Sequence, residues 1–395
     1  KLVTSDSFGL FALTAIYREG CGCSLVIGTI AEEMGKQKLV EPGFMANRPK
    51  HRVDLPWPIG SQGPIDPSSM GIDTQRLKKA LDAAFSEPGP EKPRKTRAII
   101  VVYDGQLIAE RYASGFNKDM PLLGWSMSKS ITNALVGILV RQKRLDIMQP
   151  APVPEWQNEG DARKNITLDQ LLRMSSGLEF EEIYAPLFDV THMLYGSYDF
   201  AAYAAAKPLE TEPDGKWHYS SGTANIVARI VRQTVANEYE YYYNFIYEEL
   251  FDRIGIYSAV LEPDSSGTFV GSSYAFATPR DWARFGLLYL NNGVWQGERV
   301  LPEGWVEYTT TPTPKASRGE YGAHFWLNAG SVDDPNNRRW PSAPRDAFAA
   351  LGFQEQKVIV IPSKKLLLIR FGATTDRKKW DSDEFIRNVL ECLPS

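Results

Sequence analysis

Apolar residues recur every three to four positions over several stretches of the chain, and this period predicts amphipathic helices. The first clear stretch is 74–85, which follows the polar segment Pro67-Ser68-Ser69. Further helices are predicted over 130–145, 167–174, 223–235, 281–291 and 383–390. The segment SITNALVGILVRQKRL at 130–145 ends in basic residues, which interact favourably with the C-terminal end of a helix dipole.

Two pairs of apolar segments predict strands near opposite ends of the chain. The segments 97–103 and 106–112 flank Asp104-Gly105, a dipeptide that favours tight hairpin turns. Near the other end, 356–361 and 366–371 flank a Pro-Ser-Lys-Lys turn. We therefore expect an α/β (α+β) protein. An antiparallel sheet, built from both chain ends and flanked by helices, should carry an inserted and mostly helical second domain.

The region before these elements has a different character. The apolar stretch 8–16 (FGLFALTAI) is followed directly by charged residues, so it predicts a packed helix rather than a signal peptide. Residues 40–70 are rich in proline and glycine and predict an extended arm. We expect an N-terminal helix with its arm, an α/β domain in two segments and a helical domain, over 1–65, 66–120 with 280–395, and 121–279.

Composition narrows the classes of partner. Hydrophobic residues make up 43% and charged residues 23% of the 395 positions, which is ordinary for a folded globular protein. The formal net charge is −4 and the sequence has no basic stripe, which argues against nucleic-acid binding. No apolar run approaches the length of a membrane span. The expected partner is a small molecule, and the oligomeric state stays open.

Three cysteines, Cys21, Cys23 and Cys392, leave two alternatives open. A disulfide from Cys21 or Cys23 to Cys392 would join the two ends of the chain, whereas free thiols would pack as small apolar groups. The Cys-Gly-Cys pair lacks a second pair of ligands at zinc spacing, so we expect no metal site there.

The segment WSMSKS at 125–130 carries the strongest chemical signal. Ser126 and Lys129 stand three positions apart at the start of a predicted helix, where residues i and i+3 share one face. A serine hydroxyl needs a base to act as a nucleophile, and a lysine can be that base when burial lowers its pKa. The backbone N–H of Ser126 is a candidate oxyanion donor. Taken alone, the pair would also fit a helix-capping serine beside a solvated lysine.

A second polar segment, WHYSSGT at 217–223, opens another predicted helix. Tyr219 in this segment is placed to point its phenol at the Ser126–Lys129 pair and to relay a proton to a leaving group. Ser221, two positions further on, is expected to donate to the lysine or to the substrate. The alternative for this segment is an aromatic turn that only packs.

Several segments together resemble one family: WSMSKS, MSSGLEF, HYSSGTAN, DWARFGLLYL and the terminal pair of strands. They are similar to class C β-lactamases, serine esterases and D-alanyl-D-alanine carboxypeptidases, and most similar to the branch that contains 6-aminohexanoate-dimer (nylon oligomer) hydrolases. The resemblance covers roughly 65–395. It implies a β-lactamase/transpeptidase-like fold, an active site between the two domains, an acyl-enzyme and no cofactor. It places the nucleophile, base and tyrosine on Ser126, Lys129 and Tyr219.

The third motif of that family, Lys-Thr-Gly or His-x-Gly, is not clear in this chain. The equivalent stretch is Gly-Phe-Gln-Glu-Gln at 352–356, so the resemblance makes the backbone N–H of Phe353 the second oxyanion donor. Gln354 and Glu355 become candidates to face the substrate. Pointing inward, Glu355 would raise the pKa of Lys129 and hinder the base, and we expect it to face solvent instead. The missing motif removes the usual anchor for a substrate carboxylate, which favours an ester or amide over a β-lactam.

Other residues allow further hypotheses. Three aromatic residues are candidates either to line the cleft or to pack at its rim: Tyr184, Tyr195 and Trp326. His218 and His324 would allow a Ser-His-Asp triad, but no Gly-x-Ser-x-Gly elbow accompanies them. Glu181 and Glu182 would suggest the paired carboxylates of a glycosidase. Adjacent loop residues rarely face one another, so we expect a solvated pair.

These observations favour a serine hydrolase that cleaves a short ester or amide through an acyl-serine intermediate. The alternatives are a non-hydrolytic acyl-binding or sensor protein of the same fold, a β-lactamase or D-alanyl-D-alanine carboxypeptidase, and an acyltransferase. The resemblance also implies a periplasmic or secreted bacterial location.

Overall fold

One antiparallel sheet brings the two ends of the chain together. The computed structural model describes residues 2–5, 12–27, 36–37, 39–41, 43–89, 91 and 93–394. The sheet has six strands in the order β11-β12-β13-β14-β4-β5. Its strands are β4 (Thr96–Tyr103), β5 (Gln106–Tyr112), β11 (Trp326–Leu327), β12 (Phe348–Gly352), β13 (Gln356–Ile361) and β14 (Leu366–Gly372). Because β14 pairs with β4, the predicted sheet built from both chain ends is confirmed.

The turn between β4 and β5 fixes the register of this hairpin. Asp104 and Gly105 both have positive φ, 45° and 77°, as a two-residue turn between antiparallel strands requires. Tyr103 therefore pairs with Gln106 directly across the turn.

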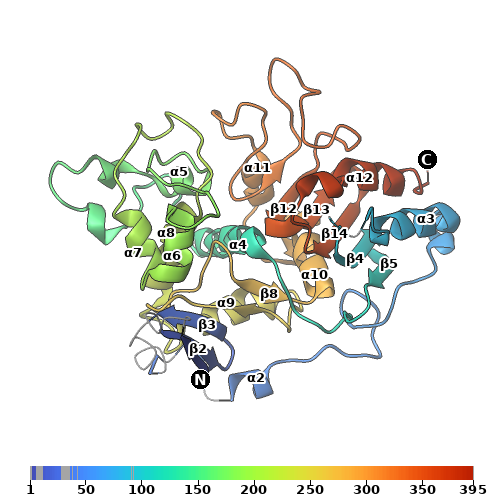
Figure 1. Cartoon of the computed structure of the whole chain (residues 1–395), viewed down its shortest axis with the longest axis horizontal. Helices are drawn as coiled ribbons and strands as arrows, with labels where there is room; N and C mark the ends of the chain where they lie inside the picture. The colour runs from blue at the N-terminus through green and yellow to red at the C-terminus, as the bar shows by residue number, and fades with distance from the viewer. Residues whose placement is uncertain are drawn as a thin grey trace.

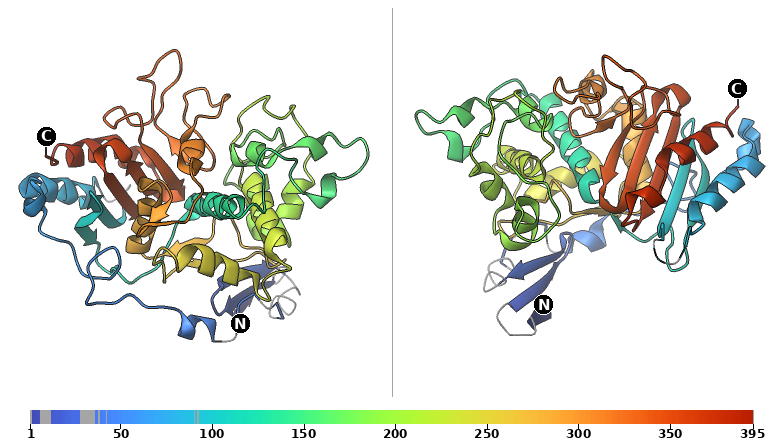
Figure 2. Two further views of the ribbon diagram at one scale, coloured as in Figure 1. Left: turned by 180° about the vertical axis from the view of Figure 1, so that it is seen from behind. Right: turned by 45° about the horizontal axis from the view of Figure 1, so that its top comes forward.

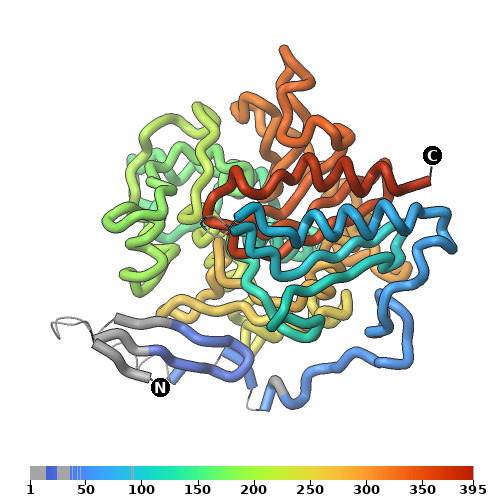
Figure 3. The backbone as a smooth tube through the Cα atoms, turned by 45° about the vertical axis from the view of Figure 1, so that its right-hand side comes forward, coloured from blue at the N-terminus to red at the C-terminus, as the bar shows by residue number. Residues whose placement is uncertain are grey.

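Helices cover both faces of the sheet. α3 (Thr74–Phe85) and α12 (Ser382–Leu390) lie side by side over one face (Figure 3), and α10 (Pro279–Leu290) packs against the other. On β4, Ile99 belongs to the core under α3 and α12, whereas Ile100 belongs to the core that includes α10. The alternation of these two apolar side chains explains why β4 reads as an almost continuous apolar run.

The middle of the chain is mostly helical, as predicted. Its helices are α4 (Ser128–Arg141), α5 (Leu168–Leu172), α6 (Asp189–Gly196), α7 (Phe200–Ala205), α8 (Ser221–Val235) and α9 (Tyr242–Ile246). α4 runs between the sheet and the other helices (Figure 1), and its residues from Ser128 to Leu139 are buried on every side. None of the helices in the described part of the chain is long and apolar enough to cross a membrane.

Smaller elements connect these layers. They are β6 (Leu122–Leu123), β7 (Val260–Leu261) and β8 (Ala275–Ala277) in a small sheet, the hairpin β9 (Val294–Trp295) and β10 (Glu298–Arg299), and α11 (Trp305–Thr310). β8 lies between β6 and β7, so it ties the strand that precedes the Ser126 turn to the helical part of the molecule.

The predicted N-terminal helix over 8–16 is wrong where the structure describes it. A three-stranded antiparallel sheet occupies this region, with β1 (Leu2–Ser5), β2 (Ala12–Arg18) and β3 (Gly22–Ile27). Residues 8–11 of the predicted helix lie outside the described residues. Gly20 and Gly22 both have φ of 71° in the turn from β2 to β3, and a positive φ at these positions favours a hairpin over a continuing helix.

The proline-rich arm is extended, as predicted, and runs along the base of the molecule from α2 (Phe44–Asn47) to α3 (Figure 2). Arg284 in α10 holds it in place. Its guanidinium donates to the carbonyl oxygens of Pro58 at 2.8 Å and Gly60 at 2.7 Å, and lies over the Trp57 ring at 4.6 Å.

The cysteines are free thiols rather than a disulfide. Cys21 and Cys392 are buried and Cys23 is exposed. The Cys392 thiol donates to the carbonyl of Asn388 within α12. Burial raises the pKa of Cys21 to about 12 and that of Cys392 to about 11, so both pack as neutral groups.

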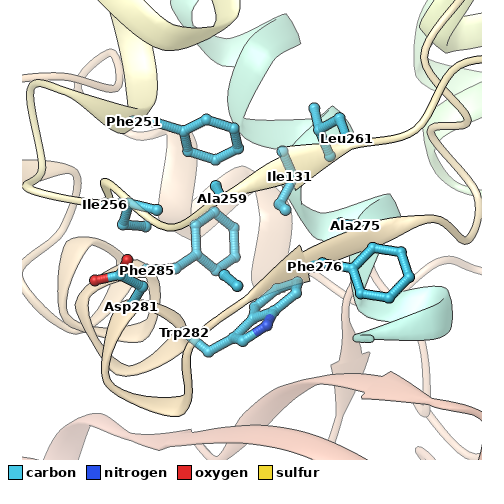
Figure 4. A pocket seen from close by; sticks show the side chains of 11 residues that line it. Ile131, Phe251, Ile256, Ala259, Leu261, Ala275, Phe276, Asp281, Trp282 and Phe285 are labelled. Atoms are coloured by element: carbon cyan, nitrogen blue, oxygen red, sulfur yellow. The ribbon is translucent and has the colours of Figure 1, made fainter. Parts of the chain in front are cut away.

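A small apolar cavity of about 10 Å³ lies between α4, α10 and the small sheet (Figure 4). Ile131 of α4 and Trp282 and Phe285 of α10 line it together with residues of β7 and β8. Because it has room for about one water and few polar partners, it is a packing gap in the core.

Candidate active site

The turn that carries Ser126 joins β6 to α4. Ser126 lies in the 3-10 turn η3 (Trp125–Met127), directly ahead of the first turn of α4. Trp125 has φ of 49°, in the left-handed region that non-glycine residues seldom adopt. The Ser128 hydroxyl donates to the Trp125 carbonyl at 2.7 Å and accepts from the Ala275 N–H at 3.0 Å. These two bonds fix the turn and therefore the position of Ser126.

Lys129 is buried and has an acceptor for each of its three N–H groups. Its Nζ lies 3.2 Å from Ser126 Oγ, 3.0 Å from Ser221 Oγ and 3.1 Å from the main-chain oxygen of Ser272. The residue is 1% exposed, so the alternative of a solvated lysine is wrong. The predicted pairing of Lys129 with the Ser126 hydroxyl is present.

The surroundings of Lys129 lower the pKa of its ammonium group. Burial lowers the pKa of Lys129 to about 8, and the carboxylate of Glu182 opposes part of this shift. A minority of Lys129 is therefore neutral near physiological pH, with a lone pair able to accept a proton.

Glu182 binds Ser221 and does not form the solvated pair expected with Glu181. Its carboxylate accepts from the Ser221 N–H at 2.7 Å and from the Ser221 hydroxyl at 2.6 Å. Ser221 is the first residue of α8, where a backbone N–H has no partner inside the helix, and a carboxylate there is stabilised by the helix dipole. The side chain of Glu182 is thereby placed next to Lys129.

Tyr219 lies beside the Ser126–Lys129 pair. Lys129 Nζ is 4.8 Å from the centroid of its ring. Burial raises the pKa of Tyr219 well above the ordinary value, and the nearby Ser126 side chain opposes this rise. The Trp326 ring packs against it at 5.3 Å between centroids. The phenol is therefore held protonated beside the nucleophile.

A cavity of about 260 Å³ opens beside Ser126, between the helical part and the end of β12. Its lining residues are Ser126, Glu182, Tyr184, Tyr219, Trp326, Arg339, Leu351, Gly352, Phe353, Glu355, Lys357 and Arg377. The lining thus combines residues that were predicted to be catalytic or to face the substrate with three basic residues that were not predicted. These are Arg339, Lys357 and Arg377.

The end of β12 approaches the Ser126 turn very closely at Gly352. A Cβ atom there would lie 2.1 Å from the main-chain oxygen of Gly124, so only glycine allows this contact. Phe353 follows directly and lines the cavity with Ser126. Its ring packs edge-on against Trp125 at 5.7 Å. The peptide of Phe353 is therefore held at the edge of the nucleophile turn.

Glu355 does not face solvent as expected. Its carboxylate lies 2.7 Å from Lys357 Nζ and is only 14% exposed, because it turns into the cavity wall. The carboxylate that acts on the pKa of Lys129 is Glu182, so Glu355 does not hinder the base in the way the sequence suggested. Gln354 and Glu355 both have positive φ, 59° and 68°, which aims the Glu355 side chain toward β13.

The aromatic candidates divide into two groups. Tyr184 and Trp326 line the cavity, and the Tyr184 ring stacks on Phe353 at 5.3 Å. The described lining does not include Tyr195 or Gln354. Tyr195 instead lines an adjoining surface pocket of about 420 Å³ that Tyr184 also borders. The main-chain oxygen of Gln354 accepts from neighbouring donors, so this residue supports the turn after β12.

The histidines do not form a triad with Ser126. His324 is buried and its Nδ1 lies 3.0 Å from the main-chain oxygen of Lys129, while burial lowers its pKa to about 3. His218 Nδ1 lies 2.9 Å from Glu210 at the surface side of its turn. His324 therefore supports the first turn of α4, and His218 binds a neighbouring carboxylate.

Sequence reasoning missed several residues of the site. Glu182 was expected to be solvated because adjacent loop residues rarely face one another, whereas its partner, Ser221, is 39 positions away. Ser272 contacts Lys129 through its main-chain oxygen. Every residue type has such an oxygen, so the sequence does not indicate this contact. Lys357 had a usable signal, since it is the one charged residue in the otherwise apolar strand around QKVIVI.

Comparison with known proteins assigns the family. A family model described as Beta-lactamase matches residues 81–387. A 6-aminohexanoate-dimer hydrolase from Paenarthrobacter ureafaciens is 25% identical over 297 residues, which cover 71% of this chain and 73% of the relative.

Solved structures agree on the fold. A protein assigned as a 6-aminohexanoate-dimer hydrolase from Bacillus anthracis has a TM-score of 0.63 at 22% identity, covering 91% of this chain and 97% of its own. A family VIII carboxylesterase has a TM-score of 0.61 at 16% identity, covering 84% of this chain and 99% of its own. The chain therefore belongs to the β-lactamase family.

Proposed function

We propose that this chain hydrolyses short esters or amides through a covalent acyl-enzyme on Ser126, with Lys129 as the general base and Tyr219 as the proton relay. The observation that carries the proposal is the position of Lys129 Nζ, buried and 3.2 Å from Ser126 Oγ. Two further acceptors hold it there, and its pKa is lowered to about 8. A base with a pKa near the working pH is the most effective one.

Acylation begins when neutral Lys129 takes the proton of the Ser126 hydroxyl. Ser126 Oγ forms a bond to the substrate carbonyl carbon, and the carbonyl electron pair moves onto its oxygen. The N–H groups of Ser126 and Phe353 stabilise this oxyanion. When the intermediate collapses, the bond to the leaving group breaks. The leaving group takes the Tyr219 proton, and Tyr219 regains one from Lys129.

Deacylation repeats these steps with water. Neutral Lys129 takes a proton from the incoming water, whose oxygen attacks the acyl carbon. The bond to Ser126 Oγ then breaks, Ser126 Oγ takes a proton from Tyr219, Tyr219 regains one from Lys129, and a carboxylic acid leaves. The high pKa of Tyr219 supports this role, because a protonated phenol can donate to an amine or alkoxide leaving group.

Two observations support an ester or amide substrate. Among the relatives, one is named as a hydrolase of a 6-aminohexanoate dimer and another as a carboxylesterase. The cavity walls beside Ser126 also include the aromatic rings of Tyr184, Trp326 and Phe353, which fit an apolar portion of a small substrate.

A panel of chromogenic substrates tests the proposal. We expect the protein to hydrolyse p-nitrophenyl acetate or butyrate, or the matching p-nitroanilides. Ser126→Ala and Lys129→Met should each lower kcat by at least about a thousandfold. Ser69→Ala, an exposed serine outside the cavity, is the matched control and should keep the activity. Hydrolysis that persists in Ser126→Ala would overturn the proposal.

A further inference from the structure

A buried tyrosine next to Tyr219 has a hydroxyl that neither the fold nor the proposed mechanism uses. Tyr321 is fully buried, and its hydroxyl has no hydrogen-bond partner among the described residues. Tyr243 is equally buried, but its hydroxyl donates to the main-chain oxygen of Leu261 at 2.9 Å. A buried donor without a partner lowers the stability of the fold, so the Tyr321 hydroxyl does not serve folding.

A tight turn fixes the position of Tyr321. Tyr321 and Trp326 form an antiparallel bridge. Inside this bridge, the Gly322 N–H donates to the Phe325 carbonyl at 3.0 Å. A Cβ atom at Gly322 would lie 2.0 Å from the main-chain oxygen of Thr309, so only glycine fits there. The turn therefore holds the Tyr321 ring in one place.

The Tyr321 ring packs directly against Tyr219, the proposed proton relay. The two ring centroids are 5.7 Å apart and the rings are nearly perpendicular, at 88°. Trp326 packs on both, at 5.1 Å from Tyr321 and 5.3 Å from Tyr219. All three rings belong to one apolar cluster, where a charge on one phenol acts strongly on the other.

The two phenols influence each other through their charges. Burial raises the pKa of Tyr219 well above its ordinary value, and the neighbouring Tyr321 phenol adds to this rise. Burial does the same to the pKa of Tyr321, where the Glu182 carboxylate adds to the rise. Two phenolates in one apolar cluster would repel each other, so Tyr321 keeps its proton whenever Tyr219 loses one. Tyr321 is then a neutral O–H donor next to a negatively charged neighbour.

We infer that Tyr321 is a positioning residue of the proton relay, and that its hydroxyl stabilises the negative charge on the Tyr219 oxygen. This role rests on the proposed function, because Tyr219 carries that charge only between protonating the leaving group and regaining a proton from Lys129. Tyr321 transfers no proton itself, and its O–H only turns toward the charge. An interaction that forms only in the transition state raises the rate of the chemical step.

Tyr321→Phe tests this role, because it removes the hydroxyl and keeps the ring. The substrates are the butyrate esters of p-nitrophenol, phenol and ethanol, which share one acyl group, and pH-stat titration follows all three. p-Nitrophenolate leaves without a proton, whereas ethoxide has to be protonated. We therefore expect kcat/KM to fall by about tenfold for the ethyl ester and by less than about twofold for the p-nitrophenyl ester.

Stability in urea separates this role from packing. Tyr321→Phe should have the same urea midpoint as the parent or a higher one, since it removes a buried hydroxyl that has no partner among the described residues. Tyr243→Phe is the matched control. It removes a hydroxyl that is bonded to Leu261, so it should lower the urea midpoint and leave kcat/KM unchanged for all three esters.

A double-mutant cycle shows whether Tyr321 acts through Tyr219. Tyr219→Phe should lower kcat/KM with the same dependence on the leaving group. Because the charge on the Tyr219 oxygen is then absent, adding Tyr321→Phe should change kcat/KM for the ethyl ester by less than about twofold.

The outcomes separate the two proposals. An equal loss of kcat/KM for all three esters in Tyr321→Phe, or no loss, would overturn the inference alone. A drop in urea midpoint like that of Tyr243→Phe would overturn it as well, because the hydroxyl would then be bonded in the resting protein. So would a tenfold effect of Tyr321→Phe that persists in the Tyr219→Phe background. Hydrolysis that does not depend on Ser126 would instead contradict the proposed function.

Discussion

The Glu182 carboxylate accepts both polar hydrogens of Ser221, the backbone N–H at 2.7 Å and the hydroxyl at 2.6 Å. Because the hydroxyl hydrogen is committed to Glu182, the Ser221 oxygen presents its lone pairs to Lys129 Nζ, 3.0 Å away. A loop carboxylate thus acts on the buried base, directly through its charge and indirectly through one hydroxyl.

Glu182→Gln should shift the pH dependence of activity. In the parent protein kcat/KM should rise with pH through an apparent pKa of about 8, because Lys129 must lose its proton to act as a base. Glu182 raises this pKa, since its negative charge favours the ammonium, so its removal should move the midpoint to lower pH. The pH profile of kcat/KM measures this. Glu181→Gln changes the exposed neighbour and should not move the midpoint. The same midpoint in Glu182→Gln and in the parent would refute the electrostatic role.

Ser221→Ala should lower kcat more than it raises KM. The substitution removes one of the three acceptors of Lys129 Nζ and leaves Glu182 without its hydroxyl donor. We expect kcat to fall by roughly tenfold to a hundredfold, as for other positioning groups around a base. Steady-state kinetics on a p-nitrophenyl ester provide both constants. A loss confined to KM would show that Ser221 contacts substrate instead of positioning the base.

Gly352→Ala should impair catalysis by moving the end of β12. The added Cβ would meet the main-chain oxygen of Gly124 at 2.1 Å, so the strand has to retreat from the Ser126 turn. The Phe353 N–H would move with it, and loss of one oxyanion donor typically lowers kcat by about a hundredfold or more.

Gly63→Ala is the control for this effect, because nothing lies within 4 Å of the position of its Cβ. It should leave kcat unchanged. Full activity in Gly352→Ala, with the fold intact by circular dichroism, would contradict the placement of Phe353 in the oxyanion site.

Glu355→Gln should destabilise the fold in a pH-dependent way. It leaves the Lys357 ammonium buried without its counter-ion, which typically costs about 3 kcal/mol of unfolding free energy. Burial lowers the pKa of Lys357 to about 8 and Glu355 opposes this, so the variant lysine deprotonates more readily. The loss should therefore be largest below pH 8 and shrink as the pH rises above it.

Urea denaturation at several pH values measures this loss of stability. Lys78→Gln breaks the exposed pair between Lys78 and Asp82 and should change the free energy of unfolding by well under about 1 kcal/mol at any pH. A loss in Glu355→Gln that does not vary with pH would show that the pair is not the source of the effect.

Local patterns predicted the parts of the fold that local forces determine. The helix at 74–85 and the hairpin around Asp104-Gly105 have the predicted bounds to within one residue, because amphipathic period and turn chemistry both lie within a few positions. The described part of the stretch 8–16, residues 12–16, was misassigned because a short apolar run fits a helix or a strand equally well.

The residues of the site also divide into those that local sequence predicts and those that depend on distant contacts. Ser126 and Lys129 were predictable because one helical turn separates them, and Tyr219 because it opens a helix in a recognisable polar segment. The contact between Glu182 and Ser221 depends on how a loop folds back over α8, which the sequence alone does not reveal. Glu355 was expected to face solvent, whereas its carboxylate contacts Lys357 in the strand that follows.

Intact mass spectrometry shows directly whether Ser126 carries the acyl group. The protein and its Ser126→Ala variant would be mixed with a short-chain p-nitrophenyl ester, quenched in acid and weighed by mass spectrometry during turnover. We expect an added mass of one acyl group on the parent, none on Ser126→Ala, and continued release of product by the parent alone. An adduct that persists without turnover would contradict hydrolysis, and an equal adduct on Ser126→Ala would contradict Ser126 as the nucleophile.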